Sequence, residues 1–464
     1  MKVKELVSRI NLPARASMGY LGASLVGKAI GLITTPFFTR LVSEEEYGRL
    51  ILYMTVLGGV SVICSAVSSG SAVYAGFKKY GDTNGAYVRS VLTVSLVFST
   101  SICLLLFAFL PFFDFPRRFY LPLLLQVLCD TAVGVSMARA RYRYKYLEVM
   151  TVGILSSAIP AIFSIIILTK YGSAFGIRIY SLLLISMITA TIQLIRLLRL
   201  PGRQNKALIK RTVRSSLPLL PHSLSVSLSG QADKMFITSA MGASALAKYS
   251  VVHSLGIALQ FAVTSLGSAL GPWIIRRLDA KEEERISEVI GTLFSLFCAL
   301  SLGLCALAPE AMRLLAPSKY LEALPALIPI ALSTPLSLIS YALTVGLVHS
   351  GRGKYTATVS LTNLVLIVLF NYTLIPRFGY LGAGLALLLS QLLSLLLGLL
   401  FLKWTSIKNM FSLKESRGVF LLTALSSIGL FFLYYNTALR VAFLIIPVIM
   451  FLNAIFQSKR LIME

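Results

Sequence analysis

The chain has 464 residues, of which 56% are hydrophobic and 13% are charged, and its mean hydropathy is +0.82. Soluble domains carry about 25% charged residues, so this composition excludes a soluble globular protein and predicts an integral membrane protein. In a membrane protein, the formal net charge of +25 is first compared with the distribution of basic residues between the two sides of the membrane.

Apolar stretches of about 20 residues, each long enough to cross a bilayer as a helix, recur between short polar loops. We expect an all-α polytopic membrane protein with about 14 transmembrane helices. The loops are too short for a soluble catalytic domain, so we expect no enzyme. The stretches lie near residues 18–40, 50–76, 90–111, 119–138, 150–169, 177–198, 216–240, 249–275, 289–309, 323–349, 356–376, 380–402, 418–435 and 441–457.

The basic residues indicate the orientation, because Lys and Arg resist translocation and accumulate in cytoplasmic loops. With the N-terminus inside, most of the 43 Lys and Arg residues fall on the cytoplasmic side, most densely at 139–145 and 199–215. Both termini are then predicted to be cytoplasmic. Since the net charge is largely this topological signal, we expect attraction to anionic membrane lipids and no nucleic-acid partner.

All the cysteines fall within predicted spans, and none is arranged as CxxC. This pattern predicts reduced thiols, and it gives no reason to expect a metal or another cofactor. The cysteines are Cys64, Cys103, Cys129, Cys298 and Cys305.

The sequence contains an internal repeat. The segment FFTRLVSEEEYGR at 37–49 aligns without gaps to FITSAMGASALAK at 236–248, and KYGSAFG at 170–176 resembles RFGYLGAG at 377–384. We therefore predict two pseudo-symmetric six-helix lobes in the same orientation, an arrangement in which transporters place the substrate between the lobes. The predicted parts are an N-terminal lobe at 1–198, a basic cytoplasmic linker at 199–215, a C-terminal lobe at 216–403 and an additional helix pair at 404–464.

Charged residues deep inside predicted spans are the strongest candidates for function. A charge at the bilayer centre costs about 2.5–3.5 kcal/mol unless it faces water, a partner or a ligand. Lys28 lies at the centre of a polar stripe that includes Ser24 and Thr35 at helical spacing. We interpret Lys28 as facing a cavity, whereas the hydroxyls either join it there or pack helices together.

The seventh predicted span is polar over a wide face, which indicates that it lines water. It carries Gln231, Asp233 and Lys234. Asp233 either compensates Lys234 locally or is a buried carboxylate that carries a proton as access alternates. Asp130, with Gln126 one turn away, is open to the same two interpretations, one structural and one functional.

The eighth predicted span places His253 and Gln260 on one face together with several glycines. Small residues there permit close helix approach or a hinge. His253 either titrates during transport or is a buried, hydrogen-bonded histidine.

Two stretches resemble a known family. These are RASMGYLGASLVGKAIGLITTPFFTRLVSEEEYG at 15–48 and SGRGKYTATVSLTNLVLIVLFNYTLIPRFGYLGAGLALLLSQ at 350–391. They are similar to the polysaccharide transport family, the Wzx-type flippases, of the multidrug/oligosaccharidyl-lipid/polysaccharide exporter superfamily. The resemblance implies a V-shaped pair of lobes around a cationic cavity. It further implies that undecaprenyl-pyrophosphate-linked oligosaccharide moves across the bacterial cytoplasmic membrane to its outer leaflet.

In related lipid II flippases arginines contact the pyrophosphate, and the resemblance places Lys28, Arg49 and Lys234 at the matching positions. Two of the three are lysines, so a point-charge contact replaces bidentate guanidinium recognition.

The chemistry of such a substrate assigns roles to the remaining candidates, because phosphates need cations and sugars need hydroxyl and amide groups. We expect the cavity to include Ser24, Thr35, Gln231 and Gln260. Candidates for coupling transport to H⁺, Na⁺ or the membrane potential are Asp233, Asp130 and His253. The expected partners are a lipid-linked glycan, membrane lipids and other polysaccharide assembly proteins.

Two other functions compete with this interpretation. A cation-coupled multidrug or metabolite antiporter of the same superfamily would need acidic residues in its cavity to bind organic cations. A glycan polymerase or ligase would need a long outer loop rich in Arg and His, which the sequence lacks.

Overall fold

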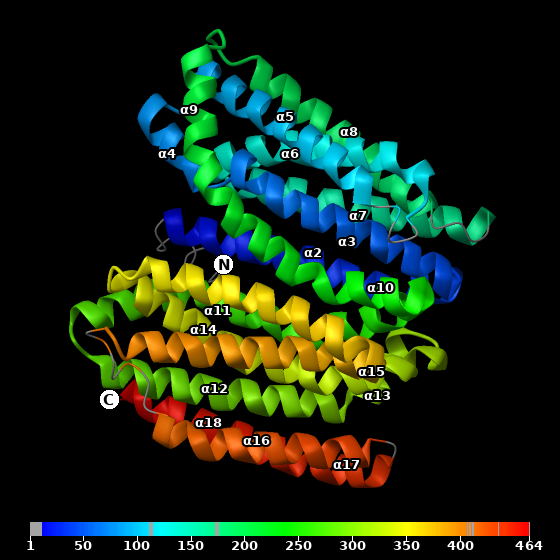
Figure 1. Ribbon diagram of the computed structural model, residues 1–464, viewed down its shortest axis with the longest axis vertical. Coiled ribbons are helices and arrows are strands. Elements are labelled where there is room, and N and C mark those ends of the chain that lie inside the picture. Colours follow the sequence, from blue (N-terminus) through cyan, green and yellow to red (C-terminus); the bar gives the residue numbers. More distant parts are fainter. Residues whose placement is uncertain are drawn as a thin grey trace, which may run out of the picture. The chain divides into compact units, whose positions relative to one another are not determined.

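The computed structural model describes residues 12–109, 111, 115–171, 176–405, 407, 410, 413–434 and 436–463. Within these residues all regular structure is helical, which confirms the predicted all-α fold (Figure 1). The contacts between residues divide the chain into two compact units, Met1–Ala247 and Lys248–Glu464.

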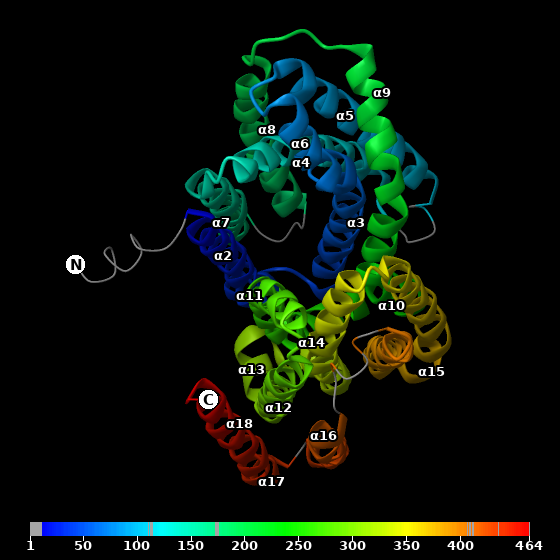
Figure 2. The ribbon, with the colours of Figure 1, turned by 90° about the vertical axis from the view of Figure 1, so that its left-hand side faces the viewer.

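Unit 1 contains the first eight labelled α-helices and the beginning of a ninth (Figure 2). Helix α2 packs against α7, α6 packs against α8 and α5, and α3 packs against α6. The helices are α2 (Leu12–Leu41), α3 (Glu44–Ser68), α4 (Ser71–Tyr80), α5 (Gly85–Phe109), α6 (Tyr120–Tyr142), α7 (Tyr146–Tyr171), α8 (Gly176–Leu198), α9 (Lys206–Ser216) and the first part of α10 (Leu220–Gly256). Two 3-10 turns, η2 (Arg117–Phe119) and η3 (Leu217–Leu219), lead into α6 and α10.

Unit 2 is built around the packing of α14 against α15, α12 and α11. The C-terminal helices α16 and α18 pack against α12. The elements are α11 (Ala258–Asp279), α12 (Glu283–Ala306), α13 (Ala308–Leu315), the 3-10 helix η4 (Ser318–Ala326), α14 (Leu327–His349), α15 (Gly353–Leu402), α16 (Leu413–Leu433), α17 (Thr437–Phe443) and α18 (Ile445–Met463).

The helices are long and apolar enough for a multi-pass membrane protein. In the described part of the chain 10 helices pass this test, or up to 11 if the bent pair within α11 counts as one span. The 50-residue helix α15 has a break at Gly379, where φ is 55°, so it contains two of the predicted spans. The expected number of 14 is compatible with this architecture.

The turn between α2 and α3 shows how the sequence sets a helix boundary. Ser43 is the N-cap of α3, and its Oγ accepts a hydrogen bond from the backbone N–H of Glu46 at 3.3 Å. Three glutamates in the first turn then interact favourably with the positive end of the helix dipole. The SEEE segment at 43–46, which is part of the family resemblance, therefore caps and begins α3.

Helix α10 contacts α3 on both sides of its kink at Gly242. Ser227 Oγ donates to the backbone oxygen of Gly59 at 2.7 Å, and Ser244 Oγ donates to Glu44 Oε2 at the same distance. The division between the units therefore falls at residue 247, beyond the kink, whereas the sequence places the start of the second lobe at residue 216. The assignment of spans to lobes stays a prediction.

Candidate functional site

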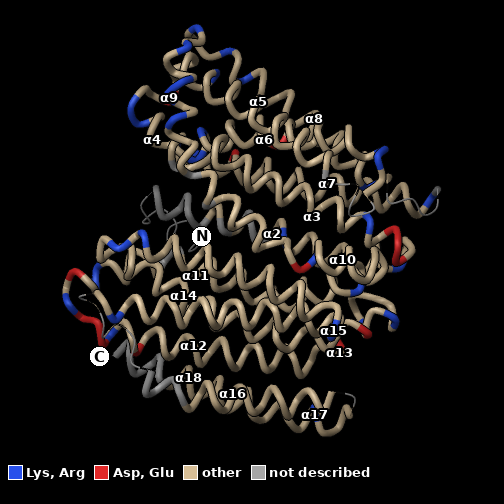
Figure 3. The backbone as a smooth tube through the Cα atoms, in the orientation of Figure 1, with Lys and Arg blue, Asp and Glu red and all other residues tan. Residues whose placement is uncertain are grey.

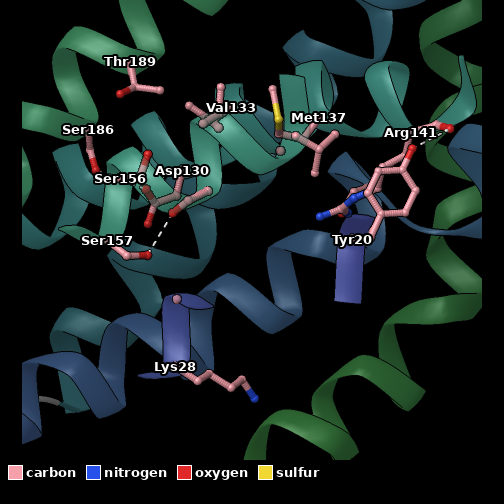
Figure 4. Close-up of a pocket in the computed structure, with 16 residues that line it drawn as sticks. Tyr20, Lys28, Asp130, Val133, Met137, Arg141, Ser156, Ser157, Ser186 and Thr189 are labelled. Carbon is pink, nitrogen blue, oxygen red and sulfur yellow. Dashed lines mark hydrogen bonds between the residues drawn. The ribbon is translucent and has the colours of Figure 1, made fainter. Parts of the chain in front are cut away.

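Unit 1 contains a polar cavity of about 680 Å³ among five of its helices (Figure 4). Its walls come from α2, the end of α3, α6, α7 and α8, so residues far apart in the sequence meet there. The hydroxyl-bearing residues of the lining are Tyr20, Ser69, Ser156, Ser157, Ser186 and Thr189, and its charged residues are Lys28, Asp130 and Arg141.

Lys28 contributes the cation that the sequence singles out. It extends from α2 beside Gly27, and its side chain lies in the cavity lining. In Figure 4 its ammonium points away from the Asp130 carboxylate. The location in a cavity agrees with the expectation that an intramembrane lysine faces space for water or a ligand.

Asp130 lies on the wall formed by α6, and neighbouring amide and hydroxyl groups orient it. Gln126 Nε2 donates to Asp130 Oδ1 at 3.2 Å and to Ser186 Oγ at 2.6 Å. Ser186 Oγ in turn lies 3.5 Å from the same carboxylate oxygen. A carboxylate in this setting can hold a proton or contribute oxygen ligands to a hard cation.

Arg141 is a second cation of the cavity, which the sequence pattern assigned to a cytoplasmic loop. On α6 it shares a stripe with Asp130, Gly134 and Met137, all of which line the cavity. Tyr20 donates from its hydroxyl to the backbone oxygen of Arg141 at 3.4 Å. The spacing of these positions along α6 was the available signal, because residues three, four and seven apart share a helix face.

Hydroxyl groups of α7 and α8 were not predicted from the sequence. Ser156 and Ser157 from α7 lie near Ser186 and Thr189 from α8, on the same side as Asp130 (Figure 4). Ser157 donates to the backbone oxygen of Gly153 at 2.9 Å. Serines in apolar spans commonly bond to their own helix in this way, so the sequence alone could not distinguish lining from packing.

Two predicted site residues of α2 and α3 are absent from the lining of this cavity. Thr35 is buried and donates to the backbone oxygen of Gly31, one turn earlier on its own helix, at 2.9 Å. Arg49 forms an ion pair of 2.8 Å with Glu45 one turn earlier on α3. The side chain of Ser24 lies outside the described part of the structure.

The predicted residues of α10 form their own polar group within unit 1. Lys234 Nζ donates to Gln231 Oε1 at 3.5 Å, and Asp233 is buried with 2% of its surface exposed. Gln231 lies beside Gly58 and Gly59 of α3. These three residues do not line the cavity of Lys28, and their roles remain predictions.

The two predicted residues of unit 2 are buried or hydrogen-bonded. Ser337 of α14 donates to Gln260 Oε1 at 2.8 Å, so Gln260 links two helices. His253 is 8% exposed, with its ring 5.5 Å from that of Tyr249. Burial of His253 agrees with the structural alternative for that residue, and its role in coupling stays untested.

An all-helical fold with many apolar spans, together with a polar, charged cavity inside one unit, is that of a polytopic membrane protein. The chain belongs to the family described as polysaccharide biosynthesis protein, which matches residues 15–278. A second family, MatE, matches residues 218–373. This confirms the family resemblance found in the sequence.

Solved structures show the same fold at low sequence identity. The lipid II flippase MurJ in an inward closed conformation is 13% identical, with a TM-score of 0.73, and the match covers 96% of this chain and 99% of MurJ. An inward-facing multidrug resistance MATE family transporter is 15% identical, with a TM-score of 0.58 and coverage of 84% and 98%.

A transporter of the MOP superfamily from Pyrococcus furiosus is 15% identical, with a TM-score of 0.56 and coverage of 86% and 96%. No curated protein matches the chain by sequence. The fold is therefore that of the MOP superfamily of membrane transporters.

Proposed function

We propose that this protein is a flippase that moves an undecaprenyl-pyrophosphate-linked oligosaccharide across a bacterial cytoplasmic membrane, for assembly of a cell-surface polysaccharide. The observation that carries the proposal is the cavity in which Lys28 and Arg141 lie among hydroxyl side chains. Membership of the polysaccharide biosynthesis family supports it, as does the fold shared with a lipid II flippase.

The composition of the cavity fits the headgroup of such a lipid. A diphosphate brings negative charge that Lys28 and Arg141 can neutralise, and Arg141 can bind it through two parallel N–H groups. The oligosaccharide presents hydroxyls that serine and threonine side chains can donate to or accept from. The polyprenyl tail is apolar, so it can remain in lipid while the headgroup crosses.

In the proposed transport step, the headgroup moves outward from Lys28 to Arg49 and Lys234. Arg49 is paired with Glu45, whose side chain is 64% exposed. Exposed ion pairs one turn apart contribute only about 0.3–0.5 kcal/mol, so a phosphate can displace this carboxylate at little cost. Lys234 makes a hydrogen bond of 3.5 Å to Gln231, which is long for a charged donor and equally easy to replace.

Release of the headgroup requires that the attraction of the cations be offset. Asp130 lies in the same cavity as Lys28, so its ionised form competes with a phosphate for the local positive charge. Loss of a proton from Asp130 would then favour release, and protonation would favour rebinding. Asp233 and His253 are further candidates for coupling to H⁺ or Na⁺, and the membrane potential is an alternative driving force.

A cation-coupled multidrug or metabolite antiporter is the second candidate. The specific observation in its favour is Asp130, an acid that faces the cavity and is oriented by Gln126 and Ser186. An organic cation could pair with this carboxylate, but Lys28 and Arg141 would repel it. The balance of charge in the cavity therefore favours an anionic substrate.

The decisive experiment reconstitutes the purified protein in proteoliposomes with undecaprenyl-diphosphate oligosaccharide. Translocation is measured as the fraction of glycan that becomes accessible to an added glycosidase. We expect Lys28→Ala to slow it at least tenfold and Lys28→Arg to restore much of it, while Lys354→Ala, at an exposed position of α15, leaves it unchanged. Accumulation of an organic cation without glycan movement would instead establish the antiporter.

A further inference from the structure

Unit 1 has a second hollow, an apolar slot of about 320 Å³ between α3, α5 and the segment that runs from α9 into α10. Val97 and Phe98 of α5 form one wall, and Val213 and Leu217 form the other. The slot shares no residue with the polar cavity of Lys28. Its chemistry therefore calls for a different ligand.

Helix α9, which covers this slot, is strongly amphipathic. Ile209, Val213 and Ser216 recur at helical spacing and line the slot. On the opposite side of the helix, Arg211 lies over the ring of Tyr80 at 5.5 Å. Thr212 is buried, so α9 is fixed to unit 1 along one flank.

The other flank of α9 carries a row of cations along the slot. Lys206, Lys210 and Arg214 are spaced four residues apart, adjacent to the slot-lining stripe, and all three are exposed. The helix KALIKRTVRSS contains no acidic residue. Figure 3 shows Lys and Arg gathered around α9 and α4, whereas the long middle sections of the spans are almost free of charge.

Exposed apolar groups lie beside these cations. Val213 is 43% exposed and Leu217 is 60% exposed. A helix with a basic row next to exposed apolar side chains is typical of the membrane interface, where the cations meet lipid phosphates and the apolar groups meet acyl chains. The density of basic residues at this end is also typical of the cytoplasmic side of a membrane protein.

A polar group in the slot still needs a partner. Ser216 is 2% exposed and lines the slot, and its Oγ has no hydrogen-bond partner among the described residues. Buried hydroxyls are normally satisfied. A ligand that places an acceptor oxygen next to an apolar chain would provide the missing partner.

We propose that the slot binds an anionic phospholipid of the surrounding membrane. One acyl chain occupies the space between α5 and α9, the phosphate contacts Lys210 and Arg214, and Ser216 donates to an ester oxygen of the glycerol. The row of cations selects negatively charged headgroups, and the slot selects a lipid over a free phosphate. The proposal is independent of the transported substrate.

Native mass spectrometry of the purified full-length protein tests this site. The protein is incubated with phosphatidylglycerol and phosphatidylcholine that carry identical acyl chains, at equal concentrations. We expect wild type to retain phosphatidylglycerol at least five times more often, and the double variant Lys210→Gln, Arg214→Gln to reduce this ratio to near one. The matched control Lys281→Gln, Lys354→Gln removes two exposed cations of unit 2 and keeps the preference.

Filling the slot tests the acyl chain separately. Val213→Trp should lower the number of tightly bound lipids of both kinds, and Val97→Trp on the opposite wall provides a second variant if the first does not fold. The proposal is overturned if wild type retains the two lipids equally, or if the double charge variant keeps the preference for phosphatidylglycerol. It is also overturned if both tryptophan variants fold and still retain as much lipid as wild type. Glycan translocation is measured on the same variants, so a failure of the transport proposal is distinguishable from a failure of lipid binding.

Discussion

Gln126 and Asp130 lie one turn apart on α6 and are joined by a hydrogen bond of 3.2 Å from Nε2 to Oδ1. The same amide donates to Ser186 of α8 at 2.6 Å, so three polar side chains from two helices form one connected group. Asp130 and Ser186 of this group line the cavity that also contains Lys28. An acid oriented toward a cationic cavity can change the charge seen by a ligand when it gains or loses a proton.

The first prediction concerns this acid. Asp130→Asn keeps the hydrogen-bonding shape but fixes the side chain in a neutral state. If Asp130 carries the coupling proton, we expect transport in proteoliposomes to slow at least tenfold and to lose its dependence on an imposed pH gradient, whereas substrate binding persists. Glycosidase accessibility under defined internal and external pH measures this.

Asp279→Asn serves as the control, because Asp279 is an acid at the end of α11 that pairs with His349 at 2.8 Å. It should leave the pH response intact. If transport by Asp130→Asn responds to the pH gradient as wild type does, Asp130 does not carry the coupling proton and its role is structural.

The second prediction separates the two cations of the cavity. Arg141→Gln removes the guanidinium from a residue that lines the cavity. The backbone oxygen of residue 141, which accepts the hydrogen bond from Tyr20, is preserved. We expect binding of undecaprenyl-diphosphate oligosaccharide to weaken about tenfold, as for the loss of one charge-assisted contact. Binding is measured by titration in detergent, and Arg352→Gln, at an exposed position of unit 2, is the control.

These tests rest partly on residues found from the sequence. The cost of placing charges in apolar spans identified Lys28 and Asp130, and the structure brings both to one cavity. The turn spacing likewise suggested the contact of Gln126 with Asp130. The all-α membrane fold followed from hydropathy, because a backbone in lipid must satisfy its own hydrogen bonds.

Other parts of the site depend on packing that the sequence does not display. Ser157 and Ser186 line the cavity only because α7 and α8 turn those faces toward α6, and hydroxyls serve equally well in helix contacts. Conversely, Thr35 bonds to its own helix. The resemblance grouped Lys234 with Lys28, yet Lys234 is absent from the lining of the Lys28 cavity.

The third prediction concerns the loop between α8 and α9. Arg89 donates to the backbone oxygens of Leu198 and Leu200 at 2.7 and 2.8 Å and also to that of Gly202, which fixes this loop to the start of α5. Arg89→Gln should release the loop and increase tryptic cleavage at Arg203 several-fold. Gel analysis of time points measures this, with Arg118→Gln as control; equal cleavage in both variants would show that other contacts suffice.

The fourth prediction tests the close approach of α3 to α10. A Cβ at Gly48 would collide with the backbone oxygen of Ala243, so Gly48→Ala must push the two helices apart. Overpacking of this kind costs about 1–3 kcal/mol, and we expect a lower unfolding temperature in detergent. Gly303→Ala is the matched control, because its Cβ would meet no neighbour within 4 Å and helix propensity favours alanine.

The fifth prediction addresses the ion pair between Arg440 of α17 and Glu310 of α13, which are 2.5 Å apart. The Arg440 side chain is 3% exposed, but that of Glu310 is 45% exposed. The effect of Arg440→Ala should therefore lie between about 1 kcal/mol for an exposed pair and about 3–5 kcal/mol for a buried one. Denaturant unfolding of the purified protein measures it.

Two further variants show whether charge or volume is responsible. Arg440→Ala with Glu310→Gln leaves no charge at either position but does not restore the arginine stem, so it should recover most of the lost stability if an unpaired charge causes the loss. Arg196→Ala breaks a comparable pair with Glu148 in which the arginine is 57% exposed, and it should cost less than about 1 kcal/mol. If the double variant is as unstable as Arg440→Ala, the unpaired charge is not the cause, and the lost packing of the arginine stem explains the loss of stability.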